Sequence, residues 1–146
     1  QDKYLHPKYA PVNRYAEDII GCLNNQVDGW VDWNMVLDRQ GGPNWFKNWC
    51  VAPVIVDAEN DEVYFTPLYY VMAHFSKFMR PGAVKIGCEV NNKQLKVTAV
   101  QNLDKSIALV IFNPTATKHT IELQINNQNT IISIDAQALQ TVIIKK

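Results

Sequence analysis

Apolar residues recur every three or four positions in two stretches of the first half of the chain, which predicts two amphipathic helices. The first stretch starts after Pro11 and stops at Asn24-Asn25. The second follows Thr66-Pro67, a typical N-cap and first-turn proline. The sequence therefore predicts helices over residues 12–23 and over about 67–79, with these apolar faces: Val12, Tyr15, Ala16, Ile19, Ile20 and Leu23 in the first, and Leu68, Val71, Met72, Phe75 and Met79 in the second.

Between these helices, shorter apolar runs indicate strands. Residues 29–35 are rich in Trp and Val and predict one buried strand of an α/β architecture. Residues 54–56 and 63–65 flank a polar stretch and predict a small hairpin. Residues 38–44 contain so many turn formers that they must form a loop.

The helical pattern of apolar residues ends at Arg80-Pro81-Gly82, since proline cannot continue a helix and glycine permits a turn. Residues 83–146 predict six short strands separated by turn-like breaks, as in an antiparallel sandwich or barrel. Alternation places Leu95, Val97 and Ala99 inward and Lys96 and Thr98 outward. The sequence thus predicts two domains, residues 1–82 and 83–146. The predicted strands are 84–90, 95–100, 107–112, 120–125, 130–134 and 139–144.

Composition narrows the function classes. Of the 146 residues 47% are apolar, 14 are basic and 14 are acidic, which indicates a folded chain without the positive charge of a nucleic-acid partner. Because no run of 18 apolar residues occurs, no integral membrane segment is expected. The three cysteines, Cys22, Cys50 and Cys88, fit neither a complete disulfide framework nor a metal cluster. We expect buried or free thiols, and no metal or cofactor.

Aromatic residues divide the chain unevenly. All but one precede residue 81, the exception being Phe112, and all four tryptophans lie between residues 30 and 49. One strand and two helices amount to a single α/β repeat, and a parallel strand needs neighbours on its edges and faces. The sequence therefore predicts a fragment of a larger protein, whose exposed apolar surface favours self-association.

Several tryptophan-rich blocks carry a family resemblance. The blocks Gly29–Asn34, Gly41–Trp45, Pro53–Asp57 and His74–Phe78 closely resemble the C-terminal part of glucosylceramidases of glycoside hydrolase family 30. The resemblance implies a mixed α/β and all-β fold: the last piece of a (β/α)8 barrel over residues 1–82, followed by an antiparallel β-sandwich over 83–146. It also implies three barrel elements: the last but one helix at 12–24, the eighth strand at 27–35 and the eighth helix at 67–80.

The same resemblance implies a retaining β-glycoside hydrolase, acting on a β-glucoside or a glucosylated lipid in a secreted or lysosome-like setting. Such enzymes use two carboxylates about 5–5.5 Å apart. In the family both are glutamates at the ends of the fourth and seventh barrel strands, upstream of the residues matched here. Glu17, Glu59 and Glu62 are not assigned catalytic roles, so we expect the isolated chain to be inactive.

The resemblance also implies part of a sugar pocket. Trp33, Asn48 and Trp49 are the predicted substrate-binding residues, because a flat indole suits the C–H face of a pyranose and an amide pairs with hydroxyls. Asp32 is predicted to be a buried structural acid near the site. Among the remaining aromatic residues, Trp30 and Trp45 are expected to pack. His74 is expected at a helix surface or interface.

A second interpretation stays open at this point. The chain could be a non-catalytic carbohydrate-binding or scaffold module, in which the sandwich binds sugar and the tryptophans form a surface patch. A lectin-like sandwich would be expected to carry its own aromatic platform, and Phe112 is the one aromatic residue of that half.

Overall fold

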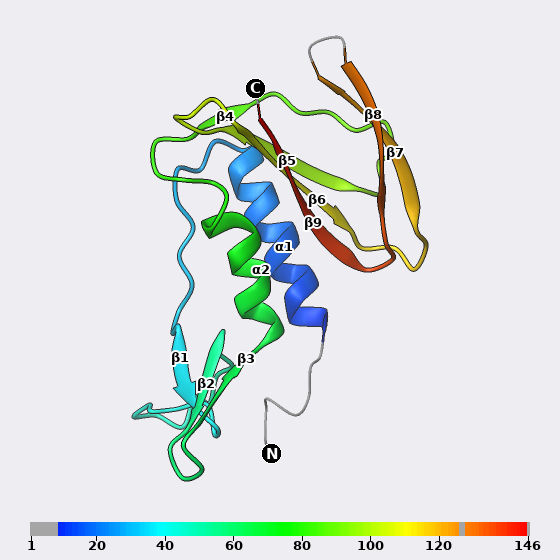
Figure 1. The fold of residues 1–146 in the computed structure, drawn as a ribbon. Helices are drawn as coiled ribbons and strands as arrows, with labels where there is room; N and C mark the ends of the chain where they lie inside the picture. The colour runs from blue at the N-terminus through cyan, green and yellow to red at the C-terminus, as the bar shows by residue number, and fades with distance from the viewer. Residues whose placement is uncertain (1–8, 126–127, 146) are drawn as a thin grey trace.

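The computed structural model describes residues 9–125 and 128–145. Two helices lie side by side and start at the same end of the molecule (Figure 1). Helix α1 spans Tyr9–Asn24 and helix α2 spans Pro67–Ser76, so both predicted helices are confirmed. Thr66 stands at the N-cap of α2, but its hydroxyl donates to the carbonyls of Ala52 and Pro53 at 3.0 Å instead of capping the helix.

A small three-stranded sheet lies at the end of the molecule where both helices start (Figure 1). Strand β1 (Val36–Asp38) pairs parallel with β2 (Val54–Asp57), which pairs antiparallel with β3 (Glu62–Phe65). The predicted hairpin is therefore confirmed.

The second half folds into two antiparallel sheets. The larger has the strand order β4-β5-β6-β9, and the smaller is the hairpin β7-β8. Their number and order match the six predicted strands. The bounds are Val84–Ile86 (β4), Lys96–Gln101 (β5), Ile107–Asn113 (β6), His119–Ile125 (β7), Gln128–Ile134 (β8) and Ala138–Ile144 (β9).

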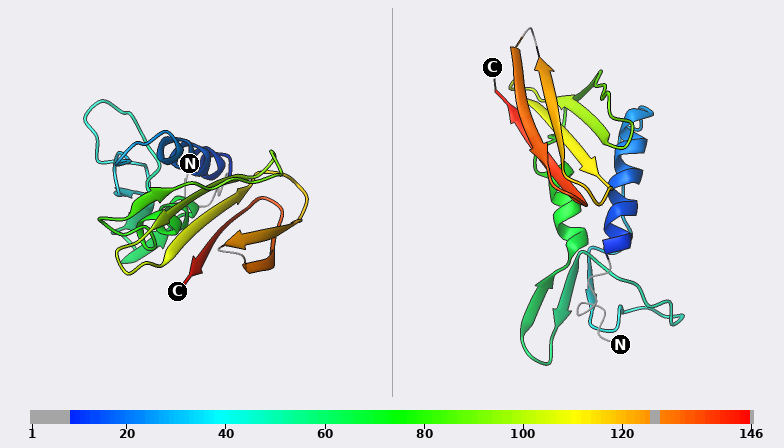
Figure 2. Two further views of the ribbon diagram at one scale, coloured as in Figure 1. Left: turned by 90° about the horizontal axis from the view of Figure 1, so that it is seen from above. Right: turned by 90° about the vertical axis from the view of Figure 1, so that its right-hand side faces the viewer.

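The four-stranded sheet is the middle layer of the molecule, with the helices on one face and β7-β8 on the other (Figure 2). Strand β6 shows this best, because it is buried on both faces. Val110 and Phe112 pack with the helices, whereas Leu109 and Ile111 pack toward β7-β8. The helices are thus fastened to the sandwich by a shared core.

Two of the predictions about strands are wrong. Residues 27–35 form no strand, because no described strand lies beside them to complete a hydrogen-bond ladder; the strand instead forms at Val36–Asp38, where β2 is available. Thr98 is fully buried although alternation placed it outward. The reason is that the helices cover the face that was expected to meet solvent.

Candidate functional site

The loop that follows β1 is held by Asp38. Its Oδ1 accepts main-chain N–H bonds from Gln40, Gly41 and Gly42 at 2.8–2.9 Å. The Asp38 N–H in turn donates to the carbonyl of Gly42 at 2.7 Å. One carboxylate oxygen therefore folds residues 38–42 into a compact turn, a common use of Asp in loops.

Two glycines let the returning chain pass over this turn. A Cβ on Gly41 would lie 2.1 Å from the Cys50 carbonyl oxygen, and one on Gly42 would lie 2.9 Å from the Trp49 ring. Gly41 also has φ +94°, which favours glycine. The Cys50 N–H donates to the Gly41 carbonyl at 3.0 Å, so the two limbs of the loop are joined.

The loop encloses a hollow of about 600 Å³ that contains two of the three predicted sugar-binding residues. Trp33 and Asn48 both line it, and the Trp33 side chain is 81% exposed. The Oδ1 of Asn44 accepts the Asn48 N–H at 3.0 Å and so fixes the backbone of Asn48. This volume is in the usual range for small-ligand pockets, roughly 300–1,000 Å³. Lys47 is the one charged side chain among the described residues that line it.

The other loop tryptophans differ in position. Trp49 does not line the hollow, and its ring lies against Gly42 instead. Trp45 lines the hollow and is 99% exposed, so the prediction that it packs is wrong: the loop carries its ring away from every core cluster. Trp30, by contrast, packs against the helical core as predicted.

Asp32 precedes Trp33 in the chain and does not itself line the hollow. Its Oδ1 accepts the Tyr15 hydroxyl and the Trp33 N–H, both at 2.8 Å. The side chain is half-buried, while Val31 and Trp33 on either side of it are exposed. Exposed and half-buried side chains therefore alternate over residues 31–33 although no strand forms there. The Asp32 side chain points toward α1, where it meets Tyr15.

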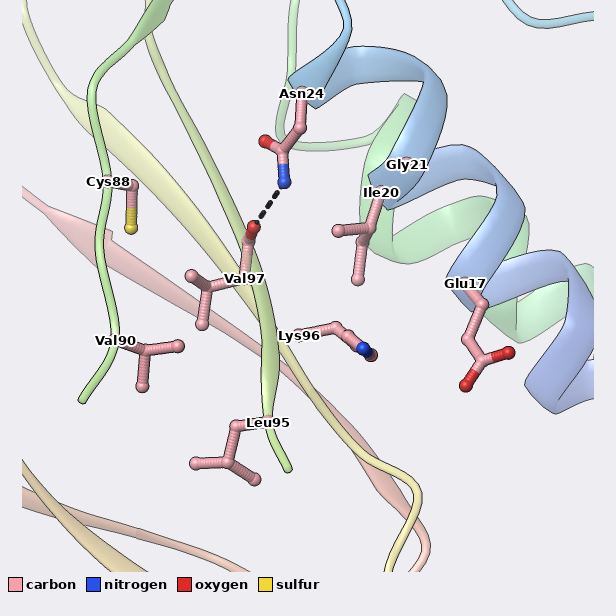
Figure 3. Close-up of a pocket in the computed structure, with 9 residues that line it drawn as sticks. All are labelled: Glu17, Ile20, Gly21, Asn24, Cys88, Val90, Leu95, Lys96 and Val97. Carbon is pink, nitrogen blue, oxygen red and sulfur yellow. Dashed lines mark hydrogen bonds between the residues drawn. The ribbon is translucent and has the colours of Figure 1, made fainter. Parts of the chain in front are cut away.

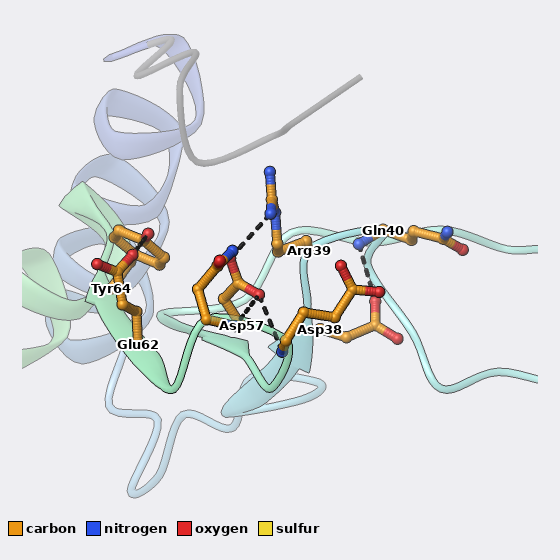
Figure 4. A network of polar contacts seen from close by, with 8 residues as sticks. Asp38, Arg39, Gln40, Asp57, Glu62 and Tyr64 are labelled. Atoms are coloured by element: carbon orange, nitrogen blue, oxygen red, sulfur yellow. Dashed lines mark hydrogen bonds and ion pairs between the residues drawn. The ribbon is translucent and has the colours of Figure 1, made fainter.

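A second polar network lies in the small sheet (Figure 4). Asp57 is buried, and its Oδ2 accepts from the Arg39 guanidinium and from the Asn60 side-chain amide, both at 2.8 Å. The Asn60 side chain first, with Arg39 and two main-chain N–H groups in support, holds the pKa of Asp57 below its usual value. Its Oδ1 accepts the main-chain N–H groups of Glu59 and Asn60 at 3.2 and 3.3 Å. Asp57 is thus structural: it closes the β2–β3 turn and, through Arg39, ties that turn to the residue after β1.

A cleft of about 450 Å³ lies between α1 and β5 (Figure 3). Glu17 and Lys96 lie on it, and the Asn24 amide donates to the Val97 carbonyl across it at 2.9 Å. Burial raises the pKa of Cys88 on its far side and keeps that thiol protonated. The cleft therefore lies at the contact between α1 and the sheet, and its Cys88 thiol is not an activated nucleophile.

The described residues form no disulfide, no metal-binding group and no membrane-spanning helix. Cys22, Cys50 and Cys88 all lie in the described part of the chain, and none of them forms a disulfide there. Within residues 9–125 and 128–145, no group of three His, Cys, Asp or Glu side chains is arranged to hold a metal. No helix in the described part of the chain is long and apolar enough to cross a membrane.

Sequence reasoning missed two residues that support the hollow. Asn44 belongs to the predicted loop, and an Asn before a turn often bonds a nearby main-chain N–H, but its partner cannot be identified from the sequence. Tyr15 was assigned to the apolar face of a helix. Its bond to Asp32 joins residues 17 positions apart, and no periodic pattern reports such a contact.

Comparison with known proteins places these features in context. Residues 5–79 match the sequence model of the Glycosyl hydrolase family 30 TIM-barrel domain, and residues 82–142 match that of the Glycosyl hydrolase family 30 beta sandwich domain. The chain is 39% identical over 127 residues to Putative glucosylceramidase 4 of Caenorhabditis elegans, covering 87% of this chain and 22% of that protein. It is 37% identical over 101 residues to Lysosomal acid glucosylceramidase of Mus musculus, covering 68% of this chain and 20% of that protein.

The fold also matches a solved structure, that of SrfJ from Salmonella typhimurium, with a TM-score of 0.89 and 26% sequence identity. The match covers 92% of this chain and 30% of that one. This chain therefore spans about a fifth of the length of the two curated relatives and less than a third of the solved structure.

Proposed function

Since the chain belongs to glycosyl hydrolase family 30, we propose that it is the C-terminal part of a retaining β-glycosidase of the glucosylceramidase type. In this proposal the whole protein hydrolyses a β-glucosyl bond to a lipid or a similar aglycone. Residues 1–82 would end the catalytic barrel and residues 83–146 would form the sandwich domain. The two glucosylceramidases matched over 68% and 87% of the chain support this substrate class.

One observation carries the proposal: Trp33, just before β1, and Asn48, in the loop that follows β1, line the same hollow. In (β/α)8 enzymes the active site gathers in the loops after the strands. The exposed Trp33 indole offers a flat face to the C–H side of a pyranose, and the Asn48 amide offers two donors and an acceptor to its hydroxyls. These two side chains would bind and orient the sugar.

The hollow itself supplies no acid–base chemistry. No carboxylate occurs among the described residues that line it, whereas retaining hydrolysis needs a nucleophile and an acid/base about 5–5.5 Å apart. We therefore assign both carboxylates to other parts of the whole protein, as the resemblance implies. The 146-residue chain alone should bind sugar weakly and hydrolyse nothing.

The alternative, a non-catalytic carbohydrate-binding sandwich, has less support. Phe112, the one aromatic residue of that half, is 1% exposed and packs beneath the helices. No described aromatic side chain on the sandwich is thus available as a platform for a sugar ring. The exposed tryptophans belong to the barrel part.

The test is an assay of the whole protein that carries this chain, with an aryl β-glucoside, an aryl β-xyloside and glucosylceramide as substrates. We expect preference for the glucosides, and kcat/KM lower by about 10-fold to 100-fold in Trp33→Ala, since a lost stacking contact weakens transition-state binding by about 1.4–2.7 kcal/mol. Val31→Ala is the matched control, because Val31 is 91% exposed on the same segment and does not line the hollow. Hydrolysis by the isolated chain, or equal activity of the two variants, would contradict the proposal.

A further inference from the structure

We propose that Tyr15 is a positioning residue for the sugar site, holding the main chain at Trp33 through Asp32. This proposal rests on the proposed function for its catalytic consequence, because it gives Trp33 the role of sugar platform. The positioning itself rests only on the geometry of the chain.

The segment that carries Trp33 has few other restraints. Between the Val27 N–H, which donates to Cys22, and the Met35 carbonyl, which accepts from Val54, the described main chain forms no hydrogen bond to another main-chain group. The segment runs from the far end of α1 back toward β1 as an unpaired trace (Figure 1). Side-chain contacts must therefore determine where Trp33 lies.

One oxygen atom provides the decisive contact. Asp32 Oδ1 accepts the Trp33 N–H and the Tyr15 hydroxyl, each at 2.8 Å. The first bond alone would leave the Asp32–Trp33 unit free to move as a whole, since the two residues are neighbours. The second bond fastens that unit to α1. Charge-assisted bonds of this kind are stronger than neutral ones.

Tyr15 is itself held firmly. It precedes the fully buried Ala16 on α1, and its ring meets the Trp30 ring edge to face, with centroids 5.4 Å apart. The Trp30 indole N–H donates to Asp18 at 2.7 Å, one turn further along the same helix. The Tyr15 ring would thus keep its place without its hydroxyl. Tyr15→Phe therefore removes the hydrogen bond to Asp32 and leaves the packing of the ring unchanged.

The hydroxyl is a donor at every relevant pH. Burial first, and then the hydrogen bond to Asp32, raise the pKa of Tyr15 to about 12. The phenol therefore stays protonated and donates to the carboxylate, in the direction that the positioning role requires.

The first experiment uses limited chymotrypsin digestion of the 146-residue chain, with cleavage after each tryptophan resolved by mass spectrometry. In Tyr15→Phe we expect cleavage after Trp33 to become about threefold to tenfold faster, while cleavage after the fully exposed Trp45 stays unchanged as an internal reference. Tyr69→Phe is the matched control, because the Tyr69 ring packs on Phe65 and its hydroxyl has no partner among the described residues. Equal cleavage after Trp33 in both variants would overturn the positioning role.

The second experiment measures KM and kcat for an aryl β-glucoside with the whole protein, in a double-mutant cycle. Tyr15→Phe should raise KM about threefold to tenfold in the unmodified background and have almost no effect on KM in Trp33→Ala, because the platform it positions is gone. An equal factor in both backgrounds would show an effect that bypasses Trp33 and would overturn the proposal. Absence of activity in the unmodified protein would contradict the proposed function instead, and the digestion would still decide the role of Tyr15.

Discussion

His74 and Thr141 lie 67 positions apart in the sequence, yet His74 Nδ1 and Thr141 Oγ1 are 2.8 Å apart. The Thr141 hydroxyl also lies 3.3 Å from the main-chain oxygen of His74. The contact joins α2 to β9, so it links the barrel part of the chain to the sandwich. Of the two positions predicted for His74, a helix surface or an interface, the structure shows the interface. Loss of the hydroxyl in Thr141→Val should cost about 1 kcal/mol of unfolding free energy, the usual net value of one hydrogen bond.

The environment of His74 at this contact should make the free energy of unfolding depend on pH. Burial lowers the pKa of His74 below its ordinary 6.5. As the pH falls, the unfolded chain therefore binds a proton at this residue before the folded chain does, and the free energy of unfolding decreases below about pH 6.5. Urea unfolding at pH 7.5 and pH 5.5 should show a smaller decrease in His74→Gln than in the unmodified chain. An equal decrease in both would contradict a half-buried His74 whose pKa is lowered in the folded chain.

Two buried threonines give opposite predictions. The Thr98 hydroxyl is buried without a hydrogen-bond partner in the described structure, whereas the Thr66 hydroxyl donates to the Ala52 and Pro53 carbonyls. Thr98→Val replaces an unsatisfied polar group with a methyl group and should raise the free energy of unfolding by about 1 kcal/mol. Thr66→Val should lower it by a similar amount. Chemical denaturation of both variants provides the test, and a loss of stability in Thr98→Val would contradict it.

The turn at Gly41 should tolerate no side chain. Ala there would place its Cβ 2.1 Å from the Cys50 carbonyl and would occupy φ +94°, so we expect a loss of about 1–3 kcal/mol. Gly87→Ala is the control, because no atom lies within 4 Å of its added Cβ, and its effect should stay within about 0.5 kcal/mol. Equal unfolding midpoints for the two variants would show that the loop can rearrange around residue 41.

The sequence predicted local structure well and long-range structure poorly. Helices α1 and α2 follow from periodicity, because a helix is formed by neighbours in the sequence, and the six sandwich strands follow from short apolar runs separated by turn residues. The tryptophan-rich blocks identified the family and the architecture, a barrel end followed by a β-sandwich, and both are confirmed. The strand predicted over residues 29–35 is wrong, since a strand depends on partners that periodicity does not report.

The candidate site shows the same difference between local features, which the sequence predicts, and long-range contacts, which it does not. The sequence drew attention to Trp33 and Asn48, and the structure brings them to one hollow. It could not indicate that Tyr15 supports Asp32 or that Trp45 is fully exposed. The first depends on where residues 27–35 pass α1, and the second on how the loop between β1 and β2 folds. Neither course is reported by a periodic pattern, because individual side-chain contacts decide it.

The exposed loop residues lead to a last prediction, on self-association. Trp45 and Phe46 are 99% and 85% exposed on adjacent positions, and Val31 and Trp33 add exposed apolar area nearby on the chain. Such a patch favours contact with a second copy when the 146-residue chain is prepared alone. At roughly 25 cal/mol per Å², burying about 60 Å² of apolar surface between two copies lowers the Kd of the dimer about tenfold.

We therefore expect the isolated chain to form dimers or larger species, and the double variant Trp45→Ser with Phe46→Ser to raise the dissociation constant at least about tenfold. Sedimentation velocity over a range of concentrations measures both. The matched control is Leu103→Ser with Ile131→Ser, since these residues are each 74% exposed but lie on the sandwich. If the control weakens association as much as the loop variant, the contact does not use the tryptophan loop. A strictly monomeric chain would mean that exposed aromatic area alone does not bring two copies together.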